Sequence, residues 1–270
     1  IGTLKMEINN LFSVKGKIAV VTGGSRGIGE MITAGFLANG AKVYISARKE
    51  LPLIQKAQEL SEKYGGECIA IPCDLSSMEG IEYFAQQLTE KEEGIDFLIN
   101  NAGAAWGEPL EDFSETGWDK VMDLNVKSIF FLTQKLKSLL KTNATNEDPS
   151  RVINIGSIDG LNVPAFETYS YSTSKAAVHH LTRVLANKLV KEDILVNAIA
   201  PGPYKSAMLG SAVNSDYSGI ADANPRGRVG TPEDMAGLAI FLCSRAGAYT
   251  VGETITSDGG LVKTAGHKLG

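Results

Sequence analysis

Short apolar segments alternate with longer amphipathic segments along the whole chain. The short segments predict strands at residues 17–22, 42–46, 67–72, 95–100, 151–156, 194–200 and 253–256. Most of them are continuous apolar runs, which is typical of strands covered on both faces of a parallel sheet. Helical periodicity occurs at residues 29–39, 51–64, 78–90, 118–141, 171–192 and 232–242. Repeated strand–helix–strand units predict an α/β fold with a doubly wound, seven-stranded parallel sheet and helices on both faces.

Two stretches lack this periodicity. Residues 142–150 contain turn-forming polar residues and predict a surface loop. Residues 206–231 combine glycine, serine, asparagine and proline, and long irregular segments of this kind are often lids or binding loops. Because no low-complexity linker divides the chain, we expect a single domain over residues 14–270, with a substrate loop at about residues 203–231.

The composition disfavours several classes of function. The 270 residues carry a formal net charge of −5 without a basic block, which argues against nucleic acid or an anionic membrane as a partner. No apolar run approaches the roughly 20 residues that cross a bilayer, and residues 1–12 lack the hydrophobic centre of a signal peptide. The three cysteines have no metal-ligand spacing, so we expect reduced, packed thiols in a cytoplasmic protein. Met6 resembles a natural start, and residues 1–13 are expected to be a cloning remnant followed by a lead-in.

A glycine-rich turn joins the first predicted strand to the first predicted helix. It reads Thr22-Gly-Gly-Ser-Arg-Gly-Ile-Gly29. Glycines at positions 23, 27 and 29 permit tight turns and the close approach of a pyrophosphate to the helix N-terminus. The spacing differs from the usual Gly-x-Gly-x-x-Gly pattern, but the strand–loop–helix context favours dinucleotide binding over a plain connecting turn.

A second motif, Tyr-Ser-Thr-Ser-Lys, places Tyr171 and Lys175 one turn apart on one face of a predicted helix. A phenol titrates near about 10 in water, and a neighbouring ammonium lowers that pKa because it favours the phenolate. The pair is therefore a candidate general acid/base at physiological pH. Taken alone, the same spacing also occurs on solvated helices.

Together, the glycine turn and the Tyr-x-x-x-Lys pair resemble those of the classical short-chain dehydrogenase/reductase family over residues 14–262. The resemblance extends to Asp74-Leu75, Asn100-Asn-Ala-Gly103, Asn125 in Asp-Leu-Asn-Val, Ser157 in Asn-Ile-Gly-Ser, and Pro201-Gly202. It implies a Rossmann fold and an oxidoreductase that acts on CH–OH or C=O groups with a nicotinamide cofactor.

The resemblance implies a catalytic set of four residues. Tyr171 would give a proton to the ketone oxygen, and Lys175 would lower the Tyr171 pKa and hold the nicotinamide ribose. Ser157 would hydrogen-bond the substrate oxygen. Asn125 would hold a water that links Lys175 to solvent.

It also implies which residues bind the cofactor. Asp74 would reach the adenine, residues 100–103 would support the sheet beside the adenine ribose, and residues 199–206 would hold the nicotinamide. The full expected set is Gly23, Ser25, Arg26, Gly27, Ile28, Gly29, Arg48, Asp74, Leu75, Asn101, Ala102, Gly103, Tyr171, Lys175, Pro201, Gly202 and Ser206.

The residues after the second predicted strand favour NADPH over NADH. The acidic residue that would select NAD through the ribose 2′-hydroxyl is replaced by Ala47. Arg48 follows it and Arg26 lies in the glycine turn, and two guanidiniums suit a 2′-phosphate. The alternative is that Arg48 merely starts a solvated helix. The cofactor expected is NADPH/NADP, which favours the reducing direction.

The histidines do not form a metal site, and no metal is expected. His179 and His180 are adjacent, so they point to different faces of the helix and cannot chelate as an i, i+4 pair would. A helix-surface or interface role is expected for them. His267 lies in a C-terminal tail.

The resemblance is greatest to 3-oxoacyl-thioester reductases of fatty acid metabolism, including the β-ketoacyl reductase associated with rhamnolipid synthesis. An apolar cleft is expected, which suits an acyl chain or an apolar ketone, although plain packing is an equal alternative for the tryptophan. The lining expected is Ala104, Ala105, Trp106, Ile158, Leu161, Pro203 and Met208. Relatives that serve an acyl carrier protein carry basic residues near the site mouth, but the corresponding stretches here read Asn146-Glu-Asp148 and Lys191-Glu-Asp193. Docking of a carrier protein is therefore doubtful, and a coenzyme A ester or free ketone competes with it.

Two alternative functions remain. A broad-range carbonyl reductase or a polyol or sugar dehydrogenase would use the same catalytic residues, and a non-catalytic NADP-binding regulator would share the fold. By analogy with the family, the helices at residues 118–141 and 171–192 are expected to pair between subunits in a homotetramer (or dimer), with a second contact near residues 253–256.

Overall fold

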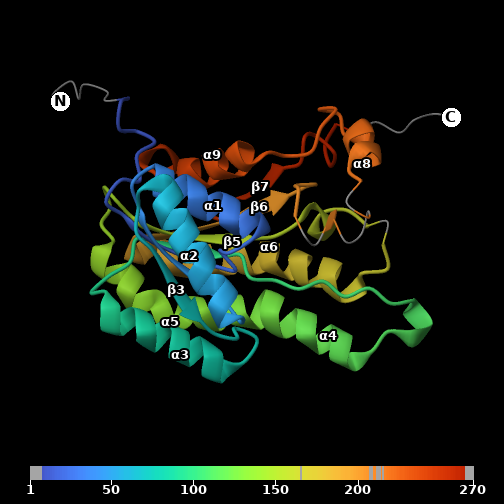
Figure 1. The fold of residues 1–270 in the computed structure, drawn as a ribbon, viewed down its shortest axis with the longest axis horizontal. Coiled ribbons are helices and arrows are strands. Elements are labelled where there is room, and N and C mark those ends of the chain that lie inside the picture. The colour runs from blue at the N-terminus through green and yellow to red at the C-terminus, as the bar shows by residue number, and fades with distance from the viewer. Residues whose placement is uncertain (1–7, 165, 207–208, 211–213, 215, 265–270) are drawn as a thin grey trace.

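The computed structural model describes residues 8–164, 166–206, 209–210, 214 and 216–264. One sheet of seven parallel strands forms its centre, in the order β3-β2-β1-β4-β5-β6-β7 (Figure 1). Its strands are β1 (Ile18–Thr22), β2 (Lys42–Ala47), β3 (Cys68–Pro72), β4 (Phe97–Asn100), β5 (Ser150–Ile155), β6 (Ile194–Pro201) and β7 (Thr254–Ser257). This order is that of a doubly wound Rossmann sheet with its switch point between β1 and β4, so the predicted fold is confirmed.

Helices cover both faces of the sheet (Figure 1). The helices are α1 (Gly27–Ala38), α2 (Glu50–Tyr64), α3 (Met78–Lys91), α4 (Glu115–Met122), α5 (Ser128–Asn143), α6 (Tyr169–Leu189), α8 (Ser218–Ala223) and α9 (Pro232–Cys243). One face packs against α1, α2 and α9, and the other against α3, α5 and α6. Within the described part of the chain, no helix is both long and apolar enough to cross a membrane.

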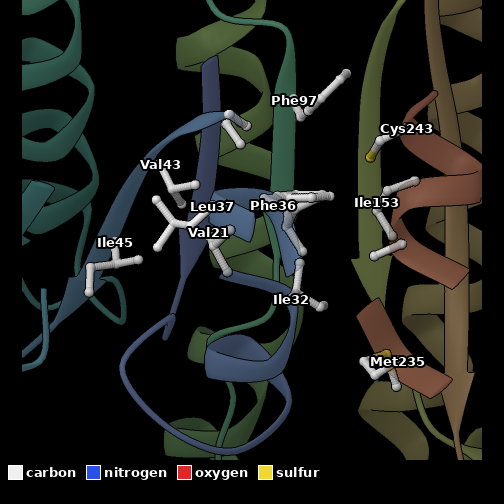
Figure 2. Close-up of a cluster of buried hydrophobic side chains, with 14 of the residues drawn as sticks. Val21, Ile32, Phe36, Leu37, Val43, Ile45, Phe97, Ile153, Met235 and Cys243 are labelled. Carbon is white, nitrogen blue, oxygen red and sulfur yellow. The ribbon is translucent and has the colours of Figure 1, made fainter. Parts of the chain in front are cut away.

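Alternate side chains of each strand enter two separate cores. On one face, Val21 belongs to the same buried cluster as Phe36 of α1 and Met235 of α9, and Figure 2 shows Val21 beside Phe36. The preceding residue, Val20, packs with Leu88 of α3 on the other face. Because both faces are buried, both sets of positions are apolar, which is why the strands are continuous apolar runs in the sequence.

Local signals explain several helix starts. Ser77 accepts a hydrogen bond from the backbone of Gly80 at the start of α3. At α9, Thr231 and Asp234 form a capping box around Pro232. These caps satisfy backbone N–H groups that have no partner inside the helix.

The helix predicted over residues 118–141 is interrupted. A π-helical segment, Asp123–Lys127, separates α4 from α5 and contains Asn125. Such segments occur frequently at functional sites, because the extra residue in the turn re-aims a side chain. The irregular stretch at residues 206–231 also contains the short helix α8, which the sequence pattern did not predict. The other predicted bounds agree to within two residues, except that α6 ends at Leu189, three residues before the predicted end.

Candidate active site

The predicted site residues gather at one edge of the sheet because parallel strands place their carboxyl ends together. Gly23 follows β1, Arg48 follows β2 and Asn101 follows β4. Ser157 follows β5, and Gly202 follows β6. Doubly wound sheets bind their ligands at this edge.

The glycine turn is shaped by close backbone contacts. Gly23 and Gly27 have φ values of 65° and 54°, in the left-handed region. A Cβ atom added at Gly29 would lie 2.3 Å from the carbonyl oxygen of Gly23, so a side chain there would push the turn off the helix. A Cβ added at Gly27 would lie 3.3 Å from Cβ of Ser206, which places the segment after β6 beside this turn. Gly29 therefore serves helix–strand packing, and Gly27 borders the segment that follows β6.

Thr22 joins the glycine turn to the segment after β4. Its Oγ1 accepts hydrogen bonds from the backbone N–H groups of Asn101 and Ala102, each at 2.9 Å. The amide of Asn101 donates to the carbonyl oxygens of Thr22, at 2.9 Å, and Gly23, at 3.3 Å. The Asn-Asn-Ala-Gly stretch thus braces the turn directly. Thr22 was not among the predicted site residues, although it is the first residue of the glycine motif.

The elements expected to bind phosphate have surroundings that suit this role. The N-cap of α1, Arg26, makes no side-chain capping hydrogen bond, so the first N–H groups of the helix are not satisfied by a cap. Arg26 and Arg48 are both exposed. β2 ends at Ala47 and α2 begins at Glu50, so Arg48 precedes the helix and does not start it. Burial favours a higher pKa for Asp74. The hydrogen bonds from Ser76 and the charge of nearby Arg48 together outweigh this effect, so the pKa of Asp74 is lowered.

The remaining predicted cofactor residues have mixed surroundings. Asp74 is exposed, but one carboxylate oxygen already accepts from the backbone and hydroxyl of Ser76, at 3.0 and 2.7 Å. Leu75 is buried in the core on the α3 side of the sheet, and Ile28 packs against the opposite core. Ser25 lies partly buried within the glycine turn. Pro201 ends β6, where it is buried.

Ser157, Tyr171 and Lys175 meet where β5 ends beside α6. The Ser157 hydroxyl lies near enough to the Tyr171 phenol to lower the pKa of that phenol. The Lys175 ammonium donates to the carbonyl oxygen of Ile155 at 2.8 Å and lies 5.5 Å from the centre of the Tyr171 ring. Ser157 and Lys175 are 7% and 5% exposed. The structure thus brings together three of the four predicted catalytic residues directly.

The pKa values differ from the expectation drawn from the Tyr-Lys spacing. Burial raises the pKa of Tyr171 to about 12, the neighbouring Ser157 hydroxyl opposes this rise, and the charge of Asp159 adds to it. Burial lowers the pKa of Lys175 to about 8, against the attraction of Asp159. The expected lowering of the Tyr171 pKa is therefore wrong, because desolvation of the phenol outweighs its neighbours. At neutral pH the phenol keeps its proton.

Asn125 is fully buried, and its side chain is hydrogen-bonded within the protein. Its amide nitrogen donates to the Ala104 carbonyl and to the Ser174 hydroxyl, both at 2.9 Å, and its oxygen accepts from the Ala104 N–H at 2.8 Å. Ser174 in turn donates to the Tyr171 carbonyl at 2.7 Å. The π-helical segment therefore ties the loop after β4 to α6. Both amide hydrogens are used in these bonds, so a water held by the Asn125 side chain would bond to its oxygen.

His179 has surroundings that the sequence did not predict. It is 4% exposed, beneath the segment that carries Ser157, whereas His180 is exposed beside Arg183. The helix-surface or interface role expected for both histidines is therefore wrong for His179. The missed signal was its spacing: residues 171, 175 and 179 follow at intervals of four and share one helix face. Within the described residues, no group of three His, Cys, Asp or Glu side chains could hold a metal ion.

The predicted cleft lining is partly corrected. The Trp106 ring packs on α4, because a Cβ added at Gly117 would lie 2.3 Å from its Nε1, and the Lys120 ammonium lies 4.6 Å from its ring centre. Plain packing therefore accounts for Trp106. Leu161 is 43% exposed on the segment between β5 and α6, as a rim residue would be. Met208 lies outside the described residues.

The acidic stretches at residues 146–148 and 191–193 lie at the opposite edge of the sheet from Ser157. They precede β5 and β6, so they lie at the amino ends of these strands. Asp148 pairs with Lys17 at 2.6 Å, and the Ser150 N–H donates to the Asp193 carbonyl. Their expected position near the site mouth is therefore wrong, and the charge argument against a carrier protein does not hold.

Comparisons with known proteins show the family. A family model described as enoyl-(acyl carrier protein) reductase matches residues 23–262. The rhamnolipids biosynthesis 3-oxoacyl-[acyl-carrier-protein] reductase of Pseudomonas aeruginosa is 49% identical over 251 residues, 92% of this chain and 97% of that protein. The 2-dehydro-3-deoxy-D-gluconate 5-dehydrogenase of Dickeya dadantii is 34% identical over 262 residues, 94% of this chain and 98% of that protein. A solved Pseudomonas aeruginosa RhlG/NADP active-site complex matches with a TM-score of 0.90 and 47% identity, covering 94% of this chain and 100% of that chain.

The chain therefore belongs to the short-chain dehydrogenase/reductase family of oxidoreductases. The resemblance predicted from the glycine turn and the Tyr-Lys pair is confirmed, including its closeness to 3-oxoacyl reductases. Relatives that act on acyl thioesters and on sugar acids are both similar over nearly the whole chain. Overall similarity does not separate these two substrate classes.

Proposed function

We propose that the protein is an NADPH-dependent reductase that transfers a hydride to an apolar ketone, with a 3-oxoacyl thioester as the favoured substrate. The observation that carries this proposal is the arrangement of Ser157, Tyr171 and Lys175 at the carboxyl edge of the sheet. The glycine turn lies at the same edge and leads into α1, whose N-terminus has no side-chain cap. The 49% identity to a reductase named for 3-oxoacyl substrates supports the choice of substrate class.

Bound NADPH would supply the hydride to the ketone carbon, and the protein would manage the ketone oxygen. In this proposal the Ser157 hydroxyl orients that oxygen and stabilises its developing charge. Tyr171 gives it the proton, and its raised pKa keeps that proton available at neutral pH. The Lys175 ammonium then stabilises the phenolate and would hold the nicotinamide ribose. The carbonyl of Ile155 holds Lys175 in place for both tasks.

The cofactor would lie along the carboxyl edge of the sheet. We propose that the turn at residues 23–29 holds the pyrophosphate and that Arg26 and Arg48 hold a 2′-phosphate. Asp74 would reach the adenine through Oδ2, since its Oδ1 accepts hydrogen bonds from Ser76. Residues 101–103 would border the adenosine ribose. Residues 199–206 would hold the nicotinamide, as the proximity of Gly27 to Ser206 allows.

Replacing Arg48 with aspartate is expected to reverse or abolish the preference for NADPH. A carboxylate at this position repels a 2′-phosphate and accepts a hydrogen bond from a 2′-hydroxyl. The ratio of kcat/KM for NADPH to that for NADH should fall about 100-fold, the size of one lost charged contact combined with a new repulsion. The lysine next to it offers a matched control, and Lys49→Asp should change that ratio little. An unchanged ratio in Arg48→Asp would refute the proposed 2′-phosphate contact.

The segment at residues 203–231 is proposed as the substrate loop. Tyr204 and Gly230 pair in a parallel bridge, so the two ends of the segment meet at the sheet edge. The buried Tyr204 side chain bonds through its hydroxyl to that of Ser257, the last residue of β7, which fixes this base of the segment. We propose that this segment lies beside the bound substrate, as a lid would.

The two alternative functions can be distinguished by the substrates that are turned over with NADPH. A sugar or polyol dehydrogenase is supported by the relatives named for sugar acids, and a regulator would bind NADPH without turnover. NADPH absorbance should be followed with 3-oxoacyl-coenzyme A esters, the same acyl groups on a carrier protein, diketones, quinones and sugars. Fastest turnover is expected with the 3-oxoacyl thioesters. Preference for sugars would reject the substrate class, and tight NADPH binding without any turnover would reject the enzyme.

We also propose a homotetramer in the cytoplasm. Large apolar side chains are exposed on the helices expected to pair between subunits, namely Trp118, Phe130 and Val184. The cysteines at positions 68, 73 and 243 are free thiols, as suits a reducing compartment. Light scattering should give a mass of about four chains, and a monomer at micromolar concentration would contradict the pairing of these helices.

A further inference from the structure

His179 contacts the segment that carries Ser157. The residue lies on α6 one turn beyond Lys175, and its Nε2 accepts a hydrogen bond from the backbone N–H of Ser157 at 3.4 Å. The ring is buried, so this contact is made without competition from bulk water. The proposed mechanism gives His179 no task.

Glycines let the segment close on this ring from both sides. A Cβ added at Gly156 would lie 2.1 Å from Nε2, and a Cβ added at Gly160 would lie 2.9 Å from Cε1. The Cβ added at Gly160 would also lie 2.6 Å from the backbone carbonyl carbon of Lys175. Residues 156–160 are therefore seated directly on α6 at His179. Between the two glycines, the Ser157 hydroxyl accepts from the Asp159 N–H at 3.1 Å, which orients the side chain within the segment.

The contact requires a particular form of the ring. Because Nε2 accepts a hydrogen, the neutral ring carries its proton on Nδ1. Burial, followed by the charge of Lys175, lowers the pKa of His179 to about 4, while the Gly160 backbone raises it and Arg183 lowers it. The ring is neutral at physiological pH and can act as the acceptor. Nδ1 is buried, and among the described residues it has no hydrogen-bond partner.

We infer that His179 is a positioning residue: its Nε2 fixes the backbone of Ser157, and thereby holds the Ser157 hydroxyl at the Tyr171 phenol where the ketone oxygen is to bind. The inference rests on the proposed reductase function. If His179 only filled the space under the segment, its effect on kcat would not depend on the Ser157 hydroxyl.

Three variants separate positioning from packing. His179→Leu keeps most of the volume but removes the acceptor, and kcat should fall about 10- to 100-fold while the Kd for NADPH stays within about twofold, as expected when a catalytic group is misplaced. His179→Gln keeps an acceptor oxygen and should recover most of kcat. His180→Leu, on the exposed neighbour, should behave as the wild type. Equal losses in the Leu and Gln variants at position 179, or none in either, would overturn the inference.

A double-mutant cycle with Ser157→Ala provides the decisive readout. If His179 acts through the Ser157 hydroxyl, His179→Leu should change kcat less than about twofold in the Ser157→Ala background. A full additional loss there would mean that His179 acts by packing or through another residue, and it would overturn the inference.

A nitrogen-15 NMR spectrum of the histidine rings in the wild-type protein tests the contact without any variant or substrate. At neutral pH, His179 should show the neutral Nδ1–H form, with a non-protonated Nε2. A protonated Nε2 would overturn the inference even if the enzyme is active. If the wild type reduces no ketone while the ring shows the expected form, then the proposed function fails and the Ser157 contact stands as structure alone.

Discussion

Replacing Tyr171 with phenylalanine is expected to lower kcat for ketone reduction by at least about 100-fold, the lower part of the range for general acid–base catalysis. The substitution removes one oxygen from a phenol whose pKa is raised to about 12, so no other group at this position holds a proton for the ketone oxygen. The Kd for NADPH should stay within about twofold, because the ring remains beside Lys175. Both quantities can be measured from NADPH absorbance and from the quenching of protein fluorescence.

Tyr169→Phe is the matched control for this substitution. Tyr169 lies two residues earlier on α6, and its hydroxyl bonds to Glu167 away from the catalytic contact. Its loss should leave kcat nearly unchanged. Near-normal turnover in Tyr171→Phe would contradict the assignment of the proton donor.

Replacing Lys175 with methionine is expected to abolish measurable turnover and yet stabilise the cofactor-free protein. Lys175 is 5% exposed and has its pKa lowered to about 8, so at neutral pH the fold holds a charge that burial disfavours. The corresponding penalty is about 3 kcal/mol, at about 1.4 kcal/mol for each pKa unit. The lost hydrogen bond to the Ile155 carbonyl offsets about 1 kcal/mol. Urea denaturation at pH 7 and equal protein concentration should therefore show a gain of about 2 kcal/mol in the free energy of unfolding.

The pH dependence of this gain gives a second check. The folded-state pKa of Lys175, about 8, lies below the unfolded value of 10.5. Below pH 8 both states are protonated, and the penalty is fully present. Between pH 8 and 10.5 the unfolded chain binds more protons than the folded one, so the wild type becomes more stable relative to the variant. The advantage of the variant should therefore fall through zero towards pH 10.5, where only its lost hydrogen bond to the Ile155 carbonyl remains. A difference that is constant with pH would contradict a charged Lys175 in the fold.

Much of the fold and site could be predicted because local patterns dictate them. The strand positions follow from apolar runs that both cores require, and Val20 and Val21 show this by entering opposite cores. The glycine turn follows from backbone geometry at Gly23, Gly27 and Gly29, which is independent of distant residues. Helical spacing alone placed Tyr171 and Lys175 together.

The rest depended on contacts between distant segments. The π-helical segment arises where Asn125 bonds to Ala104, 21 residues away, and no helical periodicity encodes this contact. The raised pKa of Tyr171 depends on how deeply the phenol is buried, which the spacing to Lys175 does not reveal. The burial of His179 depends on the segment after β5 closing over α6. The acidic residues at 146–148 were misplaced although chain order determines their position, because a loop that precedes a parallel strand lies at its amino end, opposite the site.

Direct hydride transfer to a ketone at the Tyr171 site is the central claim, and isotope transfer tests it most directly. NADPH carrying deuterium at nicotinamide C4 should be supplied, in each of its two stereoisomers, with a 3-oxoacyl-coenzyme A ester, and the product should be analysed by mass spectrometry. One stereoisomer is expected to place a single deuterium on the new carbinol carbon, with the rate of its appearance falling at least about 100-fold in Tyr171→Phe. A product without deuterium from either stereoisomer, or equal rates in the two proteins, would contradict the claim.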